Sequence, residues 1–166
     1  MRNVSLIGMP GSGKSTVGVL LAKALGYSFT DTDLLIQKQE SALLQAILDR
    51  LGNDRFLDVE ADVIGALTCD HTVIAPGGSV VYRKRGIQRL KALGPVVYLK
   101  MPYNSLEKRL GNLATRGVAL APGQTLRDLY DYRVPMYEKY ADLTANADQP
   151  TAQDTVEAIV KALREY

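Results

Sequence analysis

The sequence predicts an α/β domain in three layers, with helices on both faces of a central five-stranded parallel sheet. Short apolar runs alternate with segments of helical periodicity along the whole chain. Helical segments separate successive apolar runs, as the crossovers between parallel strands require. The run at residues 96–99 is apolar throughout, which is typical of a strand that helices cover on both faces.

Each element is assigned from its own pattern, and glycine and proline mark the boundaries. Gly26 ends the first helix, residues 52–54 interrupt a helical pattern, and residues 76–78 form a turn after a strand. No internal repeat or linker is visible in 166 residues, so a single domain over residues 1–166 is expected. The expected strands are 2–7, 27–30, 72–75, 96–99 and 143–145, and the expected helices are 14–25, 34–51, 55–67, 85–93, 103–110, 125–140 and 152–163.

Composition excludes several classes of protein. Hydrophobic residues make up 46% and charged residues 23%, as in ordinary globular domains, and the net charge of +2 indicates no nucleic-acid partner. No apolar stretch approaches the roughly 20 residues that span a bilayer. Cys69 is the only cysteine, which excludes an internal disulfide. We expect a cytoplasmic monomer that has neither a nucleic-acid nor a membrane partner.

Residues 8–15 read G-M-P-G-S-G-K-S, a complete G-x-x-x-x-G-K-[ST] pattern between an expected strand and an expected helix. Glycines in this pattern let backbone N–H groups point at phosphate oxygens. Lys14 supplies a positive charge at the β- and γ-phosphates, and the Ser15 hydroxyl can bind Mg²⁺. The sequence therefore predicts a phosphate-binding loop, called here the phosphate loop.

The phosphate loop follows the first strand, so it lies at the carboxyl edge of the sheet. Carboxyl ends of parallel strands share that edge, where ligands bind in α/β folds. We therefore expect Asp31, Asp33, the Gly77-Gly78 turn and the aperiodic loop at 112–123 to surround one cleft.

Asp31 and Asp33 belong to a D-T-D sequence after the second strand. Alternation along an extended segment would point both carboxylates to the same side. One could hold Mg²⁺ while the other accepts a proton from an attacking hydroxyl. The alternative is that Asp33 only caps the helix that follows.

Arg133 precedes Pro135 in an otherwise helical pattern. A proline inside a helix favours a bend, which could aim Arg133 at a ligand. The guanidinium fork binds both oxygens of a carboxylate. The alternative is a surface arginine with a tyrosine packed beside it.

Arg116 lies in the aperiodic loop. An arginine on a mobile loop over a nucleotide site can close on the γ-phosphate and stabilise charge in the transition state. The alternative is an arginine that is simply solvated.

Together these motifs resemble the shikimate kinase family of small-molecule P-loop kinases. The resemblance rests on the phosphate loop, D-T-D at 31–33, Gly77-Gly78, Arg116, R-V-P-M-Y at 133–137 and N-A-D-Q-P at 146–150, which follow the family's order across nearly the whole chain.

The resemblance implies a P-loop kinase fold with substrate-binding helices at about 34–67 and a mobile lid at about 112–124. It implies ATP and Mg²⁺ as cofactors, with Ser15 and Asp31 toward the metal. Asp33 would activate the substrate hydroxyl, and Lys14 and Arg116 would complete the catalytic set. The implied nucleotide-binding residues are Gly11, Ser12, Gly13, Lys14, Ser15, Thr16, Arg109 and Pro150, and the implied substrate-binding positions are Asp33, Leu57, Gly77, Gly78 and Arg133.

Three departures from the family pattern fall on the acceptor side and the lid. Leu57 stands where the family's G-E-x-x-F-R-x-x-E has an arginine, the second half of a carboxylate clamp. Arg55 is about 200° away around the helix and cannot simply replace it. Pro76 replaces a glycine of Gly-Gly-Gly, and the lid sequence R-P-L-L reads R-G-V-A here.

The function expected from this pattern is transfer of the ATP γ-phosphoryl group to a hydroxyl of a small hydroxylated carboxylate, with shikimate as the leading acceptor. A first alternative is another small hydroxy acid or an amino alcohol such as homoserine. A second alternative, from a different class, is a nucleotide-binding regulator without catalytic activity.

Overall fold

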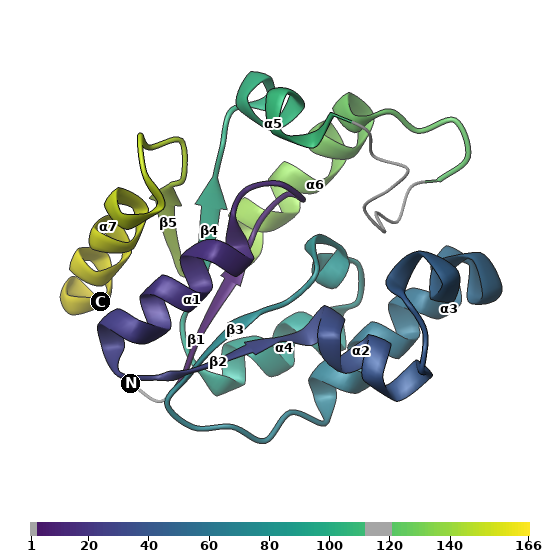
Figure 1. Cartoon of the computed structure of the whole chain (residues 1–166), viewed down its shortest axis with the longest axis horizontal. Helices are drawn as coiled ribbons and strands as arrows, with labels where there is room; N and C mark the ends of the chain where they lie inside the picture. Colours follow the sequence, from purple (N-terminus) through teal and green to yellow (C-terminus); the bar gives the residue numbers. More distant parts are fainter. Residues whose placement is uncertain (1–2, 112–120) are drawn as a thin grey trace.

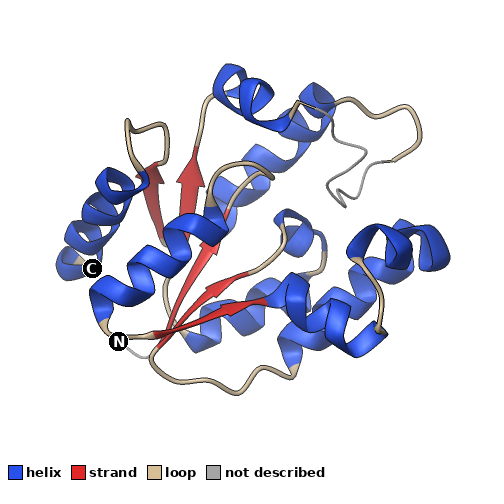
Figure 2. Cartoon of the chain, viewed as in Figure 1, coloured by secondary structure: helices blue, strands red, loops and turns tan. Residues whose placement is uncertain are grey.

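The computed structural model describes residues 3–111 and 121–166, and its core is a five-stranded sheet with all strands parallel (Figures 1 and 2). The strand order is β2-β3-β1-β4-β5. The strands are β1 (Asn3–Ile7), β2 (Ser28–Asp31), β3 (Thr72–Ala75), β4 (Val96–Lys100) and β5 (Leu143–Asn146). The helices are α1 (Lys14–Leu25), α2 (Thr32–Glu40), α3 (Leu44–Gly65), the 3₁₀ helix η1 (Gly78–Tyr82), α4 (Lys84–Leu93), α5 (Tyr103–Leu110), α6 (Leu126–Tyr140) and α7 (Ala152–Glu165).

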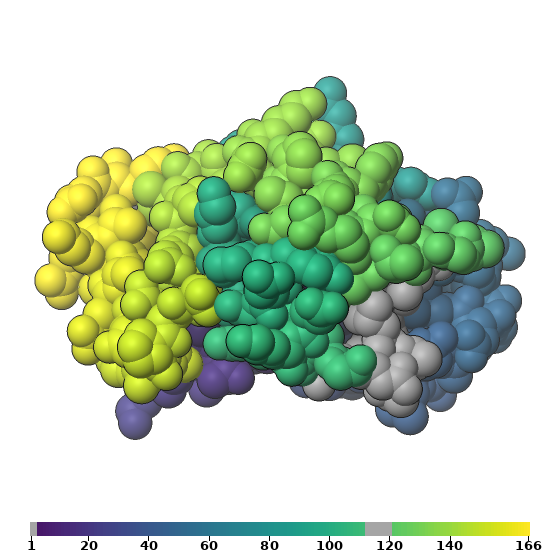
Figure 3. Space-filling view, turned by 90° about the horizontal axis from the view of Figure 1, so that it is seen from above, coloured from purple at the N-terminus to yellow at the C-terminus, as the bar shows by residue number. Residues whose placement is uncertain are grey.

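The helices form the two outer layers of a three-layer sandwich. Helices α1 and α7 pack together on one face of the sheet, and α4 and α6 cover the other face (Figure 1). Helices α2 and α3 lie beyond the β2 edge, at the opposite end of the molecule from α7 (Figure 3). The predicted fold class is confirmed, including the five parallel strands and the helices on both faces.

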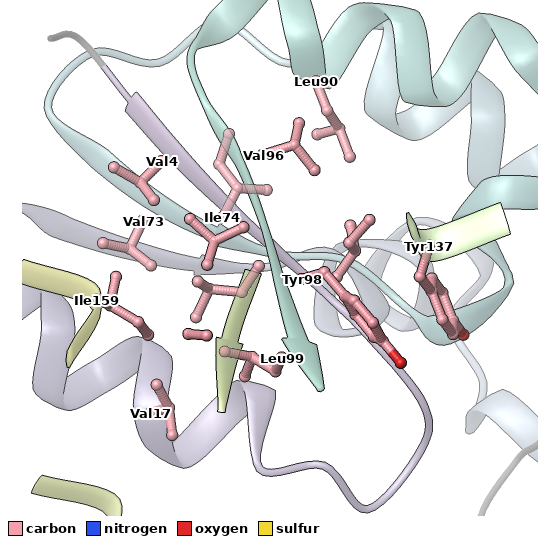
Figure 4. Packing of buried hydrophobic residues seen from close by; sticks show 14 of the residues in the cluster. Val4, Val17, Val73, Ile74, Leu90, Val96, Tyr98, Leu99, Tyr137 and Ile159 are labelled. Carbon is pink, nitrogen blue, oxygen red and sulfur yellow. The ribbon is translucent and has the colours of Figure 1, made fainter. Parts of the chain in front are cut away.

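The interior strands β3, β1 and β4 are buried along almost their whole length, although β1 also buries the polar residues Asn3 and Ser5. Side chains of β1 and β4 that are 0–1% exposed form the core together with those of the covering helices (Figure 4). The rings of Tyr98 and Tyr137 stack there with their centroids 5.3 Å apart. This contact attaches α6 to the carboxyl half of β4, close to the phosphate loop.

The sequence prediction missed one helical break in the expected substrate-binding region, because residues 34–51 were expected to form a single helix. Helix α2 ends before Ser41, which adopts a left-handed conformation with φ of 52°. The Gln37 side-chain oxygen accepts a hydrogen bond of 3.0 Å from the Leu44 N–H. This bond gives a partner to one of the backbone N–H groups at the start of α3, which have none within the helix. Gly52, expected to separate two helices, has non-helical angles, with φ of 77° and ψ of 165°, and divides α3 into two helical parts at a kink, as predicted. The break between α2 and α3, about ten residues earlier, is an additional one that the glycine pattern did not predict.

Two further local features concern α6 and the turn before η1. Helix α6 runs from Leu126 to Tyr140, close to the expected 125–140, and it continues through Pro135. A Thr125–Asp128 capping box satisfies its first turn. The turn at residues 76–78 leads into η1, where Ser79, Val80 and Val81 are buried.

Asn3 joins three segments at the amino end of the sheet. Its side-chain amide donates hydrogen bonds of 3.1 Å to the carbonyls of Cys69 and Leu93, and its side-chain oxygen accepts one of 3.1 Å from the Thr72 N–H. Gly94 packs directly on the Asn3 backbone, so that a Cβ at position 94 would overlap the Asn3 carbonyl oxygen.

Gly94→Ala should therefore lower the free energy of unfolding by about 1–3 kcal/mol, because backbone rather than a flexible side chain must move to admit the methyl group. Urea unfolding followed by circular dichroism measures this. Gly65→Ala is the matched control, since a Cβ there meets nothing within 4 Å and alanine favours the helix by up to about 1 kcal/mol. Equal stability of both variants would contradict the prediction.

Candidate active site

A cavity, called here the main cavity because the predicted site residues line it, lies at the carboxyl edge of the sheet, where the phosphate loop, D-T-D and the Gly77-Gly78 turn meet. Its volume is about 290 Å³. Ten of the residues predicted from sequence line it together: Gly11, Gly13, Lys14, Ser15, Thr16, Asp31, Asp33, Gly77, Gly78 and Arg133. The expectation that separate strand ends bring these residues to one cleft therefore agrees with the structure.

The phosphate loop adopts the conformation that its glycines predict. Gly11 and Gly13 have φ of 79° and 90°, and Gly13 precedes the first turn of α1. The Lys14 ammonium donates two hydrogen bonds of 2.8 Å, to the carbonyl oxygens of Gly8 and Met9. Burial lowers the pKa of Lys14 to about 8, although the carboxylates of Asp33 and Asp31 oppose this effect. Ser12 is buried beneath the loop, 1% exposed, rather than lining the cavity.

Asp31, not Asp33, is the N-cap of α2. Its carboxylate accepts hydrogen bonds from the N–H groups of Asp33, at 2.9 Å, and Leu34, at 3.4 Å. Both carboxylates border the same cavity, as expected, but strand alternation is not the cause, because α2 already begins at Thr32. Asp33 instead reaches the cavity from the first turn of the helix, which leaves its carboxylate available for other contacts.

Asp31 also faces the phosphate loop. The Ser15 hydroxyl lies 3.4 Å from Asp31 Oδ2. Among residues 3–111 and 121–166, no group of three or more His, Cys, Asp or Glu side chains is placed to hold a metal ion. Two oxygen ligands fit Mg²⁺ nonetheless, because this ion usually takes few protein ligands and completes its shell with phosphates and water.

Asp33 has the properties of a proton acceptor at neutral pH. Burial raises its pKa to about 6, and the nearby Asp31 carboxylate acts in the same direction, whereas Lys14 opposes them. A pKa close to the working pH is favourable for a general base.

Glu60 is a buried carboxyl group that the sequence interpretation left without a role. It is 2% exposed, and its two oxygens lie 2.9 and 3.0 Å from the Ser79 hydroxyl. Burial raises its pKa to about 8, and Asp33 adds to the shift. A protonated Glu60 satisfies both contacts, because it can donate to Ser79 with one oxygen and accept from Ser79 with the other. Pro10, Leu44, Phe56, Ala75 and Ser79 are further cavity residues without a predicted role.

Gly77 and Gly78 are required by close packing rather than by unusual backbone angles. A Cβ at Gly77 would lie 2.7 Å from Glu60 Oε2 and 3.0 Å from Asp33 Oδ1. A Cβ at Gly78 would lie 2.9 Å from an Arg133 terminal nitrogen and 3.1 Å from the Tyr137 hydroxyl. The glycine pair therefore forms a wall against which the carboxyl groups and the guanidinium converge.

Arg133 is an internal residue of α6 and is 1% exposed, so the alternative of a surface arginine is wrong. Its Nε donates a hydrogen bond of 2.9 Å to the Tyr82 hydroxyl. Tyr137, one helical turn further on, donates from its hydroxyl to the Gly78 carbonyl at 2.7 Å. These contacts attach α6 to η1 and bring the guanidinium into the cavity wall.

Leu57 lies outside the main cavity. It lines a second, mainly apolar cavity of about 270 Å³ together with Asn53, Tyr82, Ala121, Gln124 and Tyr132. Arg55 is exposed, and Arg83 is engaged with Asp54 and Asp58 at 2.7 and 2.9 Å. Neither of these two arginines occupies the place of a second carboxylate clamp.

The remaining predicted residues are less tightly placed. Arg109, in the last turn of α5, approaches the phosphate loop, with a terminal nitrogen 3.8 Å from the Cβ position of Gly13. Pro150 is exposed between β5 and α7, away from the cavity lining. Arg116 and most of the predicted lid at 112–124 lie outside the described residues.

Comparison with known proteins gives the family. The sequence profile described as shikimate kinase matches residues 10–164. The chain belongs to the shikimate kinase family. The shikimate kinase of Thermodesulfovibrio yellowstonii is 35% identical to it over 164 residues, which cover 97% of this chain and 94% of that protein.

Further relatives agree over nearly the full length. The shikimate kinase of Pseudomonas paraeruginosa is 38% identical over 170 residues, covering 99% of this chain and 97% of that protein. A structure of the shikimate kinase from Acinetobacter baumannii in complex with shikimate is 32% identical, with a TM-score of 0.91 and coverage of 99% and 94%. The protein is thus an ATP-dependent small-molecule kinase of this family.

Glu60→Gln should remove a pH dependence of stability. The folded-state pKa of about 8 lies above the ordinary value of 4.5, so the folded protein binds this proton more tightly than the unfolded chain. Its stabilising effect is complete below about pH 4.5 and is lost as the pH rises through about 8, at up to about 1.4 kcal/mol per pH unit.

Urea unfolding at about pH 5, 7 and 9 measures the stability difference between the wild type and Glu60→Gln. The wild type should lose stability relative to the variant as the pH rises. Lys14 titrates in both proteins and largely cancels in the difference. A difference that does not change with pH would contradict a protonated Glu60.

Proposed function

We propose that the protein transfers the γ-phosphoryl group of ATP to a hydroxyl group of shikimate. The observation that carries the proposal is the arrangement of the main cavity, in which one space is bordered by the phosphate loop, the Asp33 carboxylate and the buried guanidinium of Arg133. A phosphoryl donor, a proton acceptor and an anchor for an acceptor carboxylate are thereby within reach of one small ligand.

The nucleotide would occupy the phosphate-loop side of this space. Backbone N–H groups of Gly11, Ser12, Gly13 and the first turn of α1 suit its phosphates, and Ser15 and Asp31 would hold Mg²⁺. Mg²⁺ would neutralise charge on the transferred group. Arg109 and Pro150 would border the nucleoside, and Arg116 would close over the phosphates from the lid.

Lys14 would change partners when ATP binds. Its ammonium now donates to two carbonyls of the phosphate loop, and phosphate oxygens are stronger acceptors for a charged donor. Phosphate charge would also raise the pKa of Lys14 from about 8 and keep it protonated during the reaction.

The acceptor would bind between Asp33 and Arg133, along the wall formed by Gly77 and Gly78. Asp33 would take the proton of the attacking hydroxyl, and Arg133 would bind the acceptor carboxylate. The rest of the rate enhancement would come from positioning and from stabilisation of transition-state charge.

Two alternatives remain as outcomes of the same test. A smaller hydroxy acid or an amino alcohol such as homoserine is favoured by Leu57, which leaves Arg133 as the assigned anchor. A non-catalytic regulator would have no use for a carboxylate with a pKa near 6 beside its nucleotide phosphates. The expectations of a monomeric, cytoplasmic protein without a nucleic-acid partner, and of one domain over residues 1–166, stay predictions. No helix among residues 3–111 and 121–166 could cross a membrane.

ADP release by purified protein tests the proposal, with ATP, Mg²⁺ and shikimate, homoserine or gluconate as acceptor. We expect turnover with shikimate and a phosphorylated product in mass spectrometry. Lys14→Ala should abolish turnover while leaving the circular dichroism spectrum unchanged, because the lysine is placed for phosphate oxygens rather than for packing. Turnover with homoserine alone would identify the first alternative, and no turnover with any acceptor would favour the regulator.

Asp33→Asn should lower kcat by about 10²–10⁴-fold, because the amide cannot accept the hydroxyl proton, while the KM for ATP changes little. Asp31→Asn should instead raise the Mg²⁺ concentration needed for half-maximal activity. Steady-state kinetics over a series of Mg²⁺ concentrations separates these effects. Small and equal effects of the two substitutions would indicate that both residues act only in the local structure of α2.

A further inference from the structure

Ser79 places a hydroxyl group at the part of the main cavity where we place the acceptor. It lies in η1, directly after the Gly77-Gly78 wall, and it lines the cavity although the residue is only 6% exposed. Among the described residues that line this cavity, the other hydroxyl groups belong to Ser15 and Thr16 on the nucleotide side. Ser79 is therefore a neutral hydrogen-bonding group within reach of an acceptor.

Glu60 holds the Ser79 hydroxyl from outside the cavity lining. The two carboxyl oxygens of Glu60 lie 2.9 and 3.0 Å from Ser79 Oγ. Glu60 itself is 2% exposed and does not line the cavity. Ser79 thus connects a buried carboxyl group to the space in which a ligand would bind.

The protonation state of Glu60 decides what Ser79 can offer to a ligand. A serine hydroxyl has one hydrogen, which can rotate, and two lone pairs. A protonated Glu60 can donate to Ser79 Oγ, which leaves the Ser79 hydrogen able to turn into the cavity. An ionised Glu60 only accepts, so it keeps that hydrogen for itself. A ligand carboxylate, which also only accepts, is therefore bound by Ser79 only while Glu60 is protonated.

The surroundings of Glu60 favour its protonated form at neutral pH. Burial raises its pKa to about 8, and Asp33 adds to this effect, whereas the Ser79 hydrogen bond and two nearby cations oppose it. Leu57 precedes Glu60 by one turn of α3 and adds no positive charge. The charged and titratable groups that face Glu60 are Lys14 of α1, Asp33 of α2, and Arg133 and Tyr137 of α6.

We propose that Ser79 donates a hydrogen bond to the carboxylate of the acceptor and that Glu60 is the positioning residue for this hydroxyl. A neutral hydroxyl–carboxyl pair would then supply the contact that a second arginine makes in a carboxylate clamp. This inference rests on the proposed function, in which the acceptor is a carboxylate. Its consequence is that acceptor affinity falls when Glu60 ionises.

Ser79→Ala tests the direct contact, with shikimate as the probe. The readouts at pH 7 are the KM and the calorimetric dissociation constant for shikimate, kcat and the KM for ATP. Thr72→Val is the matched control, because it removes a hydroxyl that is also buried and hydrogen-bonded, at 2.9 Å to the Asp70 carbonyl, but that lies outside the cavity lining.

We expect Ser79→Ala to raise the KM and the dissociation constant for shikimate by about tenfold or more, as for loss of a hydrogen bond to a charged group. The kcat and the KM for ATP should change less than about twofold, and Thr72→Val should leave all four readouts near wild type. An unchanged shikimate affinity in Ser79→Ala, or an equal loss for shikimate and ATP, would overturn the inference.

Glu60→Gln tests the positioning role through the pH profile. Its amide can donate to Ser79 at every pH and does not ionise. Between pH 7 and 9 the KM for shikimate should therefore rise in the wild type relative to Glu60→Gln, by up to about tenfold per pH unit above the pKa of Glu60. Lys14 and Asp33 titrate in both proteins and largely cancel in the ratio.

The double variant Ser79→Ala/Glu60→Gln completes the cycle. Without the Ser79 hydroxyl, Glu60→Gln should no longer change the pH dependence of the KM for shikimate. Parallel pH profiles of the wild type and Glu60→Gln would overturn the inference even if Ser79→Ala failed to fold. If the wild type turns over shikimate but neither effect is seen, the inference alone fails. If the wild type does not use shikimate, the proposed function fails and the inference fails with it.

Discussion

Two cations and three carboxyl groups share one small, largely buried space, and their mutual compensation determines the rest of the site. Lys14 and Arg133 provide the positive charge, and Asp31, Asp33 and Glu60 provide the acidic groups. Burial disfavours every charge in this space, so the pKa of Lys14 falls while those of Asp33 and Glu60 rise. With Glu60 protonated and the other groups charged, the formal charges cancel before any ligand binds.

This balance depends on rigid elements that come from distant parts of the sequence. Lys14 begins α1, Asp33 lies in the first turn of α2, Glu60 is internal to α3 and Arg133 is internal to α6. The parallel sheet brings these elements to one edge, and the glycines at 77 and 78 allow the charged groups to approach the backbone wall between them. A side chain at either glycine would displace a charged group rather than fill empty space.

Sequence patterns predicted the sheet, the phosphate loop and the cluster of strand-end residues, because each of these depends on local periodicity or on a contiguous motif. They did not predict that α2 ends at Ser41, since its left-handed conformation is not marked by a glycine. They offered Asp33 as the alternative helix cap and did not predict that Asp31 has this role, because α2 begins two residues earlier than expected. Glu60 and Tyr82 received no role because their importance arises from burial and from partners 19 and 51 residues away, which one sequence cannot show.

The orientation of α3 explains why the departure from the family pattern at Leu57 leaves the phosphate loop and Asp33 undisturbed. Its Asp54, Asp58 and Asp62 recur every fourth residue on an outer face, where they pair with Arg83 and Arg85 near α4. Such exposed pairs each contribute little stability, so the rotation of the helix is set mainly by its buried face, which includes Phe56, Ala61 and Ile64. That rotation directs Phe56 to the main cavity, buries Glu60 against Ser79, and places Leu57 with Tyr82 at the second cavity. A change at position 57 can therefore alter how the acceptor is anchored without disturbing the groups that handle phosphate and protons.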